Sequence, residues 1–458
     1  MPPRGLRSGI CTASLSLALT LLAACGGGGG SGGGGSGGRG GDSCSTDGQV
    51  LRVESALEER YFWNDEPEQL DKYAGFNADA YADTDALLDF LRYRPDEFDR
   101  NFTYVTTIEE DSQFFGAGVF VGYGFSYRQD DNEDWLWITQ VFVGSPADNA
   151  GFARGLRINK IDGRSVAEII AADELDDAFG ESDIGVTQTF ELLDENGVAT
   201  LTTATKAEVV IDPVPQFTTF HAGGKTIGYL EFRTFVSTAS ASLNEAFAHF
   251  QAASVTDLIV DVRYNGGGLV TIAEFFASLL AGPANVSAIM AFTRFNQSNS
   301  IQNQTALFSS EPNTIDLDSI VFITTESTAS ASELVINVLE PYLDVALVGA
   351  RTFGKPVGQT ATDFCAQRLR LVTFETLNVN EEGRYFDGLP VDCPAQDELE
   401  RAVGDPLENS LSTALTWVTT GGCPSMANRS TSTLTAAAPL RRRPSGRGTP
   451  AREYANAE

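Results

Sequence analysis

The second half of this 458-residue chain alternates short apolar stretches with amphipathic ones, and this alternation limits the fold more than any other feature. Four stretches are apolar along most of their length, as strands buried on both faces are: TIGYLEF, DLIVDVR, SIVFITT and VALVGA. The segments 242–251, 271–282 and 332–343 between them carry apolar residues at helical spacing. Residues from 225 to about 420 are therefore predicted to form layers of helices on an apolar sheet, an α/β fold.

Two segments with different patterns precede the α/β part. Residues 44–110 are predicted to be mainly helical, because VLRVESALEERYFW and DTDALLDFLRYR carry apolar residues at helical spacing. Residues 111–209 show short alternating stretches between glycine-rich turns, which indicates strands. A chain of this length is too long for a single core, so we expect a helical cap (44–110), a β-rich domain (111–209) and an α/β core (210–424).

The first 24 residues resemble an export signal. Arg4 and Arg7 precede the apolar stretch LSLALTLLAA, which is too short to span a membrane. Cys25 follows directly, as it does in the signal peptides of bacterial lipoproteins. The resemblance implies that Cys25 is lipidated and that the protein is anchored in the bacterial cell envelope, facing the periplasm or the exterior. An ordinary cleaved signal with an incidental cysteine is the alternative.

Two further segments have the composition of unstructured chain. The Gly/Ser-rich stretch 25–43 predicts a flexible tether, and the basic, Ser/Thr/Pro/Ala-rich stretch 425–458 predicts a disordered tail. The whole chain carries a formal net charge of −31, which argues against nucleic acid or an anionic membrane surface as a partner, because both require a basic face. Contact with a membrane is therefore expected only through the lipid anchor.

Four cysteines remain after the predicted signal and lipidation site: Cys44, Cys365, Cys393 and Cys423. An even number in an oxidising compartment predicts two disulfides. We pair Cys44 with Cys423, since these two bracket the folded region, and Cys365 with Cys393. A zinc site is the alternative, but the sequence has no CxxC motif and its two histidines are far from these positions along the chain.

The β-rich segment resembles a PDZ domain at two motifs. GYGF resembles the loop whose amides hold the terminal carboxylate of a peptide, and GSPADNAG followed by GLRINKIDG resembles a second run of that family. The resemblance implies peptide binding by strand addition beside an apolar pocket, with protein or peptide substrates recognised by exposed C-terminal tails. Its candidate peptide-binding residues are Gly122, Tyr123, Gly124 and Phe125. A β-rich domain without a ligand is the alternative.

Six residues, STASAS, occur twice, at Ser237–Ser242 and at Ser327–Ser332. Each copy follows a strand-like stretch and precedes a helix-like one. Ser242 and Ser330 each have a glutamate three residues later, so both copies fit a helix capping box. On this pattern alone, capping is a better interpretation of either copy than catalysis.

A catalytic serine also needs a base. His221 and His249 stand in no order that suggests a catalytic triad. Lysine is the next candidate, because burial disfavours its charged form. Of the five lysines, Lys355 is the one that lies in a glycine-flanked loop beyond an apolar strand. A lysine in a surface loop is the alternative.

The segment Ser327–Gln359 resembles the signature of the carboxy-terminal processing peptidases, in which SASASE is followed, after a helix and a strand, by TFGKG and a glutamine. The resemblance implies that Ser330 is the nucleophile, Lys355 the general base and Gln359 the residue that orients the lysine. A second family motif matches DVRYNGGG and implies that the amides of Gly267 and Ala331 form the oxyanion hole. Pro356 departs from the family pattern, which has glycine after the lysine.

This resemblance covers most of residues 44–423 and implies a multidomain α/β protein: a helical cap, a PDZ-like domain and a catalytic core of the crotonase/ClpP-like type. It also implies a serine endopeptidase that needs no metal or cofactor. The copy at 237 has no downstream lysine motif and is predicted to be a helix cap.

Two other functions are open at this point. A catalytically inactive, lipid-anchored PDZ scaffold is opposed by the separation of 25 residues between Ser330 and Lys355, which agrees with the family. An acyl-handling enzyme with a crotonase-like core is opposed by the export signal, because coenzyme A thioesters are cytosolic.

Overall fold

The computed structural model describes residues 44–130, 132 and 134–424. The predicted signal, the lipidated Cys25, the tether and the basic tail lie outside these residues and stay predictions. Across the described ranges, no helix is both long and apolar enough to cross a membrane.

A six-stranded sheet forms the α/β core, in the order β10-β11-β12-β15-β16-β19. Its strands are β10 (Gln216–Ala222), β11 (Lys225–Glu231), β12 (Asp257–Asp261), β15 (Ser319–Thr324), β16 (Val345–Gly349) and β19 (Cys393–Pro394). β10 and β11 form an antiparallel hairpin, and all pairs from β11 to β19 are parallel. The four apolar stretches of the sequence lie at β11, β12, β15 and β16, so the predicted α/β pattern is confirmed.

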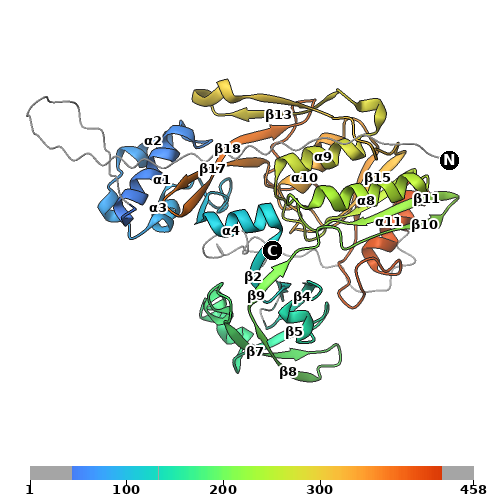
Figure 1. The fold of residues 1–458 in the computed structure, drawn as a ribbon, viewed down its shortest axis with the longest axis horizontal. Coiled ribbons are helices and arrows are strands. Elements are labelled where there is room, and N and C mark those ends of the chain that lie inside the picture. The colour runs from blue at the N-terminus through green and yellow to red at the C-terminus, as the bar shows by residue number, and fades with distance from the viewer. Residues whose placement is uncertain (1–43, 131, 133, 425–458) are drawn as a thin grey trace, which may run out of the picture. The chain divides into compact units, whose positions relative to one another are not determined.

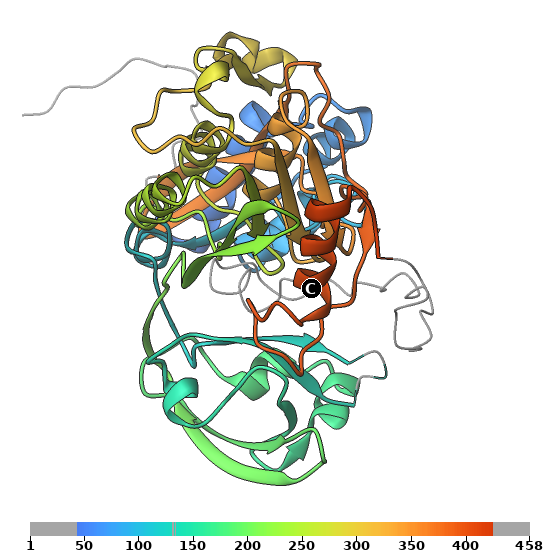
Figure 2. The same ribbon diagram turned by 90° about the vertical axis from the view of Figure 1, so that its right-hand side faces the viewer.

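Helices cover both faces of this sheet. α8 (Ala239–Ala252), α9 (Val270–Leu280) and α10 (Ala331–Leu339) pack on one face, and α11 (Asn409–Thr420) packs on the other (Figure 2). Phe247, Phe250 and Phe276 fill the first interface and are fully buried. Burial of each such side chain stabilises the folded state by about 1.5–3 kcal/mol. The double cover explains why the central strands are apolar on both faces.

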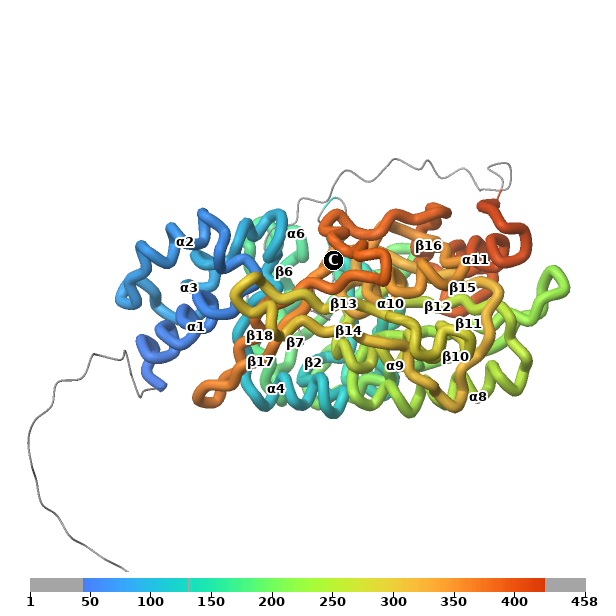
Figure 3. The backbone as a smooth tube through the Cα atoms, turned by 90° about the horizontal axis from the view of Figure 1, so that it is seen from above, coloured from blue at the N-terminus to red at the C-terminus, as the bar shows by residue number. Residues whose placement is uncertain are grey.

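A second, antiparallel sheet joins the N-terminal segment to the core. It consists of β1 (Tyr104–Thr107), β18 (Gln367–Leu377), β13 (Ile289–Phe295) and β14 (Gln304–Leu307), with β17 (Val357–Phe364) also paired to β18. α1 (Thr46–Arg60), α2 (Pro67–Ala74) and α3 (Thr84–Leu91) gather beside β17 and β18 (Figure 3). The segment 44–110 is mainly helical, as predicted, but its end supplies β1 to this sheet and so is not a helical cap alone.

The β-rich region, residues 119–210, has its own apolar core. β2 (Val119–Gly122) and β9 (Ala207–Val210) pair as a two-stranded ribbon that leads into and out of it (Figure 1). The remaining strands are β3 (Phe125–Gln129), β4 (Leu136–Val141), β5 (Arg157–Ile161), β6 (Arg164–Ser165), β7 (Thr187–Leu193) and β8 (Ala199–Thr205). They form a sheet in the order β3-β4-β5-β7-β8, with β6 paired to β5.

Shorter elements complete the fold. These are α4 (Ile108–Ser112), α5 (Pro146–Asn149), α6 (Val166–Ala171), α7 (Leu175–Phe179), the π-helical turn Gln113–Ala117 and three 3-10 turns at Ala78–Ala80, Pro283–Asn285 and Gln297–Gln302.

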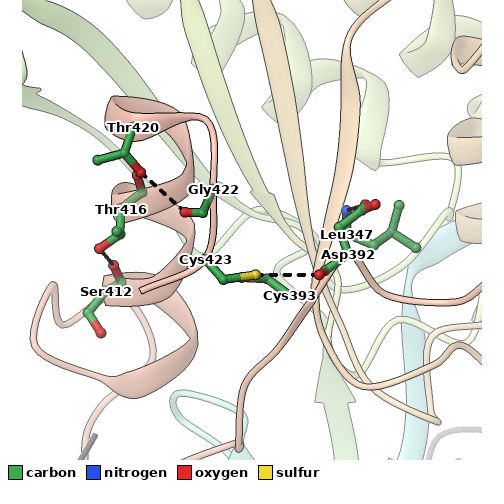
Figure 4. The surroundings of a disulfide bond; sticks show 8 residues. All are labelled: Leu347, Asp392, Cys393, Ser412, Thr416, Thr420, Gly422 and Cys423. Carbon is green, nitrogen blue, oxygen red and sulfur yellow. Dashed lines mark hydrogen bonds between the residues drawn. A yellow bond between two sulfur atoms is a disulfide. The ribbon is translucent and has the colours of Figure 1, made fainter. Parts of the chain in front are cut away.

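Two disulfides are present among the described residues, as predicted, but the predicted pairing is wrong. Cys44 bonds to Cys365 and Cys393 bonds to Cys423, with Cα–Cα distances of 5.7 and 5.6 Å. Cys365 lies in the turn between β17 and β18, close to the start of α1. Cys393 lies on β19, beside the end of α11 (Figure 4). Each end of the folded region is therefore fastened to a different sheet, whereas the prediction assumed that the two ends meet each other.

Candidate active site

Three loops meet at one edge of the parallel sheet. They follow the carboxyl ends of β12, β15 and β16, and β15 lies between the other two strands. In open α/β sheets this edge is where ligands bind. The loop after β12 contains DVRYNGGG, the loop after β15 contains the second STASAS copy, and the loop after β16 contains Lys355.

Ser330 lies between the end of its loop and the start of α10. Its backbone has φ 56° and ψ −112°, in a region that costs a residue with a side chain about 1–3 kcal/mol. Neighbouring bonds hold this turn in place: the Ala329 N–H and the Ser332 Oγ both donate to the carbonyl oxygen of Asn265, at 3.1 and 3.0 Å. A strained turn from strand to helix is a way of presenting a serine oxygen at the surface of a sheet.

Glu333 joins the loop after β15, which contains Ser330 (the serine loop), to the loop after β16, which contains Lys355 (the lysine loop). Its Oε2 accepts hydrogen bonds from the backbone N–H groups of Ser330 and Lys355, both at 2.8 Å. Its Oε1 accepts from the Gly354 N–H at 2.6 Å and from the Thr352 hydroxyl at 2.5 Å. The carboxylate is fully buried, and burial raises its pKa although these bonds act in the opposite direction. Of the capping box predicted at Ser330, the bond from the Ser330 N–H to Glu333 is present. The same carboxylate also fixes the loop of Lys355.

Lys355 is buried among groups from three parts of the chain. Its Nζ donates to Gln359 Oε1 at 3.4 Å and lies 4.9 Å from the centre of the Phe102 ring. Gln359, on β17, in turn donates from Nε2 to the carbonyl oxygen of Phe102. Phe102 was not among the predicted site residues. It reaches the site because β1, two residues later, pairs with β18, which also pairs with β17.

The loop after β12, residues 262–268, is called the glycine loop here. It lies directly against the turn at Ser330, the serine turn. Gly267 has φ 107°, and a Cβ atom there would lie 2.8 Å from the Ser330 Cβ and 2.9 Å from the Ala331 N, so only glycine fits. Ala331 is the first residue of α10, where an N–H has no partner inside the helix. The Gly267 N–H donates to Asn265 Oδ1 at 2.9 Å. The structure thus brings Gly267 and Ala331 together, but it commits the Gly267 N–H to an acceptor within its own loop.

The first STASAS copy lies at the start of α8. The capping box predicted at Ser242 is wrong, because α8 already begins at Ala239 and has Thr238 as its N-cap, without a side-chain capping bond. Ser242 therefore lies inside the helix.

The two histidines take no part in the site. Both His221, on β10, and His249, on α8, are exposed. Within the described part of the chain, no cluster of His, Cys, Asp and Glu side chains could hold a metal ion.

The predicted peptide-binding loop connects β2 to β3. The carbonyl oxygens of Tyr123 and Gly124 accept from the N–H groups of Ala147 and Phe142, at 2.8 and 2.9 Å. The Tyr123 ring is buried, and its hydroxyl donates to the carbonyl oxygen of Phe179 at 3.1 Å. The loop is therefore held from inside the β-rich region at its carbonyl groups. Gly122 ends β2 and Phe125 begins β3, an edge strand of the described sheet.

Residues 226–392 match the model of peptidase family S41. The chloroplastic C-terminal processing peptidase of Tetradesmus obliquus is 29% identical over 262 residues, which cover 54% of this chain and 53% of that protein. A CtpA-like serine protease of Staphylococcus aureus is 25% identical over 283 residues, covering 61% and 54%. The chain thus spans about half the length of these curated relatives.

Two solved structures share the fold, and the first of them is described as an S41 protease. One from Bacteroides fragilis superposes with a TM-score of 0.64 at 24% identity, covering 80% of this chain and 96% of that one. A photosystem II D1 C-terminal processing protease gives a TM-score of 0.51 at 22% identity, covering 77% and 94%. The segment that carries Ser330 and Lys355 thus matches the model of peptidase family S41, and the chain is similar in sequence to C-terminal processing peptidases.

Proposed function

We propose that the protein is a serine endopeptidase of the cell envelope that recognises the C-terminal tails of protein substrates and cleaves them with Ser330 and Lys355. The observation that carries this proposal is the Glu333 carboxylate, one oxygen of which binds the backbone N–H groups of both residues. These two bonds bring the loops of the candidate nucleophile and the candidate base together. The match to peptidase family S41 supports the same assignment.

The reaction begins with proton transfer. Lys355 in its neutral form takes the hydroxyl proton of Ser330, and the serine oxygen attacks the scissile carbonyl carbon. The Gln359 amide oxygen and the Phe102 ring hold the lysine amine in position for this step. Protonated Lys355 then donates to the leaving amine, and a water molecule hydrolyses the acyl-enzyme.

Backbone N–H groups stabilise the oxyanion that forms during both steps. Ala331 supplies one of them from the first turn of α10. Gly267 was predicted to supply the other, and its role requires release of the bond to Asn265. Gly268 is the second candidate. The Phe235 N–H donates to the Gly267 carbonyl oxygen, and the Phe235 carbonyl oxygen accepts from the Leu269 N–H. In this parallel pairing the N–H of Gly268, which lies between them, points away from Phe235.

Substrate tails bind the β-rich region, which we assign to the PDZ type. Among the described residues, strand β3 has a neighbour on one side only, so a tail can add to its other side as a further strand. The amides of the loop Gly122–Phe125 then lie at the end of the added strand, where the terminal carboxylate would be. Phe125 and Tyr127, both on this strand, contact Phe179, and the three rings favour an apolar tail.

The envelope location rests on the predicted signal and Cys25, and the two disulfides are consistent with an oxidising compartment. Palmitate labelling of the expressed protein tests the anchor, with a Cys25→Ser variant as the control. Label that persists in the variant would contradict lipidation at this residue.

Cleavage of an unfolded protein with an apolar C-terminal tail tests the activity. We expect Lys355→Ala to abolish hydrolysis while a tail peptide still binds. Amidation of the C-terminus should weaken both binding and cleavage, because it removes the anion that the loop amides would hold. Equal turnover of acid and amide substrates would contradict tail recognition, and equal turnover by the wild type and Lys355→Ala would contradict the proposed base.

A further inference from the structure

One arginine of the β-rich region reaches into the peptidase core. Arg154 follows α5 and is largely buried. Its guanidinium keeps one bond to its own region, from Nη1 to the Thr139 carbonyl oxygen at 2.9 Å. Its other partners are in the core: Asp397 Oδ1 at 2.5 Å, the carbonyl oxygens of Glu398 and Arg401 at 3.3 and 3.0 Å, and the Tyr264 hydroxyl. A single side chain therefore ties the β-rich region to two separate segments of the core.

The next residue shows how closely the two parts approach here. Gly155 has φ 85°, and a Cβ atom at this position would lie 2.6 Å from the carbonyl oxygen of Leu399. The backbone of the β-rich region is thus in direct contact with the segment that supplies Asp397. This close packing restricts how far Arg154 can move relative to its partners.

Asp397 is shared by two arginines. Arg263 donates to its Oδ1 at 2.8 Å and also pairs with Asp261 and Glu408, at 2.8 and 3.0 Å. Burial alone would raise the pKa of Asp397, but Arg154 and Arg263 outweigh it and lower the pKa to about 2. The carboxylate is therefore charged at neutral pH, and removal of either arginine leaves a buried charge short of a partner, which is costly in a protein interior.

Arg263 and Tyr264 belong to the glycine loop of the candidate active site. Tyr264 donates its hydroxyl to Asp397 and directly precedes Asn265. Asn265 is fully buried; its Oδ1 binds the Gly267 N–H, and its carbonyl oxygen binds the Ala329 N–H next to Ser330. The contacts thus run without a break from Arg154 through Tyr264 and Asn265 to the groups around the nucleophile.

We propose that Arg154 is a positioning residue of the peptidase site: from the β-rich region it holds the glycine loop in place through Asp397 and Tyr264. The catalytic geometry is then complete only while the β-rich region is docked at this point. Movement of that region would change the rate of cleavage as well as the capture of substrate. This inference rests on the proposed peptidase function.

Arg157 provides a matched control three residues away. It donates to the carbonyl oxygen of Asp194 at 2.6 Å and lies over the rings of Trp135 and Trp137, at 5.0 and 5.4 Å, all within the β-rich region. Both arginines are partly or largely buried and both carry cation–π contacts. They differ in which part of the molecule they bind.

The test compares Arg154→Ala with Arg157→Ala in the full chain. For Arg154→Ala we expect kcat to fall about 10- to 100-fold, which corresponds to about 1.4–2.7 kcal/mol, with the Kd of a tail peptide unchanged. Arg157→Ala should change kcat less than about twofold, because its contacts do not reach the glycine loop. Arg154→Lys should recover part of the rate, since an ammonium can pair with Asp397 but cannot form the other bonds of the guanidinium.

Hydrogen exchange of residues 262–268 gives a second measurement that needs no activity. Faster exchange in Arg154→Ala than in Arg157→Ala supports the proposal, and equal exchange together with wild-type kcat overturns it. If the wild type cleaves nothing, the proposed function fails, and exchange alone decides the positioning role. Should Arg154→Ala not fold, Tyr264→Phe removes the hydroxyl between Arg154 and Asp397 and keeps the ring; unchanged exchange in that variant also counts against the proposal.

Discussion

The two copies of STASAS begin helices at different points of the same six residues. In the first copy, α8 begins at the third residue, Ala239, and Ser240 lies inside the first turn. In the second copy, α10 begins at the fifth residue, Ala331, and Ser330 stays outside the helix with a positive φ. Only the second arrangement separates the serine at the fourth position from helical geometry.

The difference comes from contacts with distant parts of the chain. In the second copy the Thr328 hydroxyl donates to the Val262 carbonyl oxygen at 2.7 Å, and Glu333 binds the lysine loop. In the first copy the Ser237 N–H donates to the Phe115 carbonyl oxygen, while the Ser240 carbonyl oxygen accepts from the nearby Asn244 side chain. The local sequence thus permits a helix to begin at several positions, and tertiary contacts determine at which residue it begins.

The sharpest way to break this comparison is to replace separately the serines at the fourth position of each copy, Ser240 and Ser330. Ser330→Ala should lower proteolysis by about 10⁴-fold or more, as loss of a catalytic nucleophile does. The reason is that only Ser330 has a candidate base, Lys355, in an adjoining loop tied to it by Glu333. Hydrolysis of a tail-bearing unfolded protein measures the effect, with thermal unfolding as the check on folding. Wild-type turnover by Ser330→Ala would reverse the assignment of the two copies.

Each copy also faces a glycine, and these glycines extend the comparison. A Cβ at Gly267 would lie within 3.0 Å of Ser330, Ala331 and Ala329 atoms, whereas a Cβ at Gly118 would meet the Thr238 hydroxyl oxygen at 3.2 Å. Gly267→Ala should therefore cost about 10²-fold or more in kcat, comparable to loss of an oxyanion donor. Gly118→Ala strains a left-handed residue by about 1 kcal/mol and should lower stability with little change in kcat.

Equal effects of the two glycine variants on kcat, after correction for the folded fraction, would contradict this contrast. That result would mean that the glycine loop has no special role beside the serine turn.

A glutamate follows each copy on its helix: Glu333 in the second and Glu245 in the first. Glu333 accepts four hydrogen bonds in the core. Glu333→Gln places an amide group among donors and leaves about two of them without an acceptor, at about 1–3 kcal/mol each. We expect kcat to fall at least about 10-fold, since both loops lose their common anchor. Glu245 is exposed, and Glu245→Gln serves as the control. A Glu333→Gln enzyme with the kcat of Glu245→Gln would show that the Glu333 carboxylate does not position the site.

The pH dependence of stability tests the same carboxylate. Burial raises the folded-state pKa of Glu333 above the value of about 4.5 expected for the unfolded chain, so the folded state holds this proton more tightly. The contribution of this group to stability is then fully present below that pH and falls as the pH rises through the folded-state pKa. The advantage of the wild type over Glu333→Gln in the free energy of unfolding should therefore shrink as the pH rises above about 4.5. An advantage that grows with pH over this range would contradict the raised pKa.

Much of the core could be predicted from the sequence. Strands β11, β12, β15 and β16 are buried on both faces, and that environment leaves an uninterrupted apolar pattern in the chain. The loops of Ser330, Lys355 and Gly267 were singled out because their motifs resemble those of a known family, and the structure brings these loops to one edge of the sheet. Their catalytic roles stay predictions.

Other features depend on contacts that no local pattern encodes. Phe102 reaches Lys355 only because the short, polar strand β1 pairs with β18, far along the chain. The disulfide pairing is set by where the β17–β18 turn and β19 lie in space, not by the order of the cysteines. Arg154 binds Asp397, 243 residues away, and nothing near either residue in the sequence marks them as partners.

The smallest expected effect concerns Ser240, the serine at the fourth position of the first copy. Ser240 lies in the first turn of α8, which has no side-chain capping bond, so its hydroxyl is not needed to begin the helix. Alanine has the higher helix propensity by up to about 0.5 kcal/mol, so Ser240→Ala should leave the stability unchanged or raise it slightly. Activity should stay within about twofold of the wild type, since Ser240 is remote in the sheet order from the lysine loop after β16 and no catalytic group binds it. Chemical denaturation and proteolysis assays on the same preparation check both expectations. A loss of more than about 1 kcal/mol would mean that the hydroxyl caps the helix after all, because that is the usual cost of losing a cap.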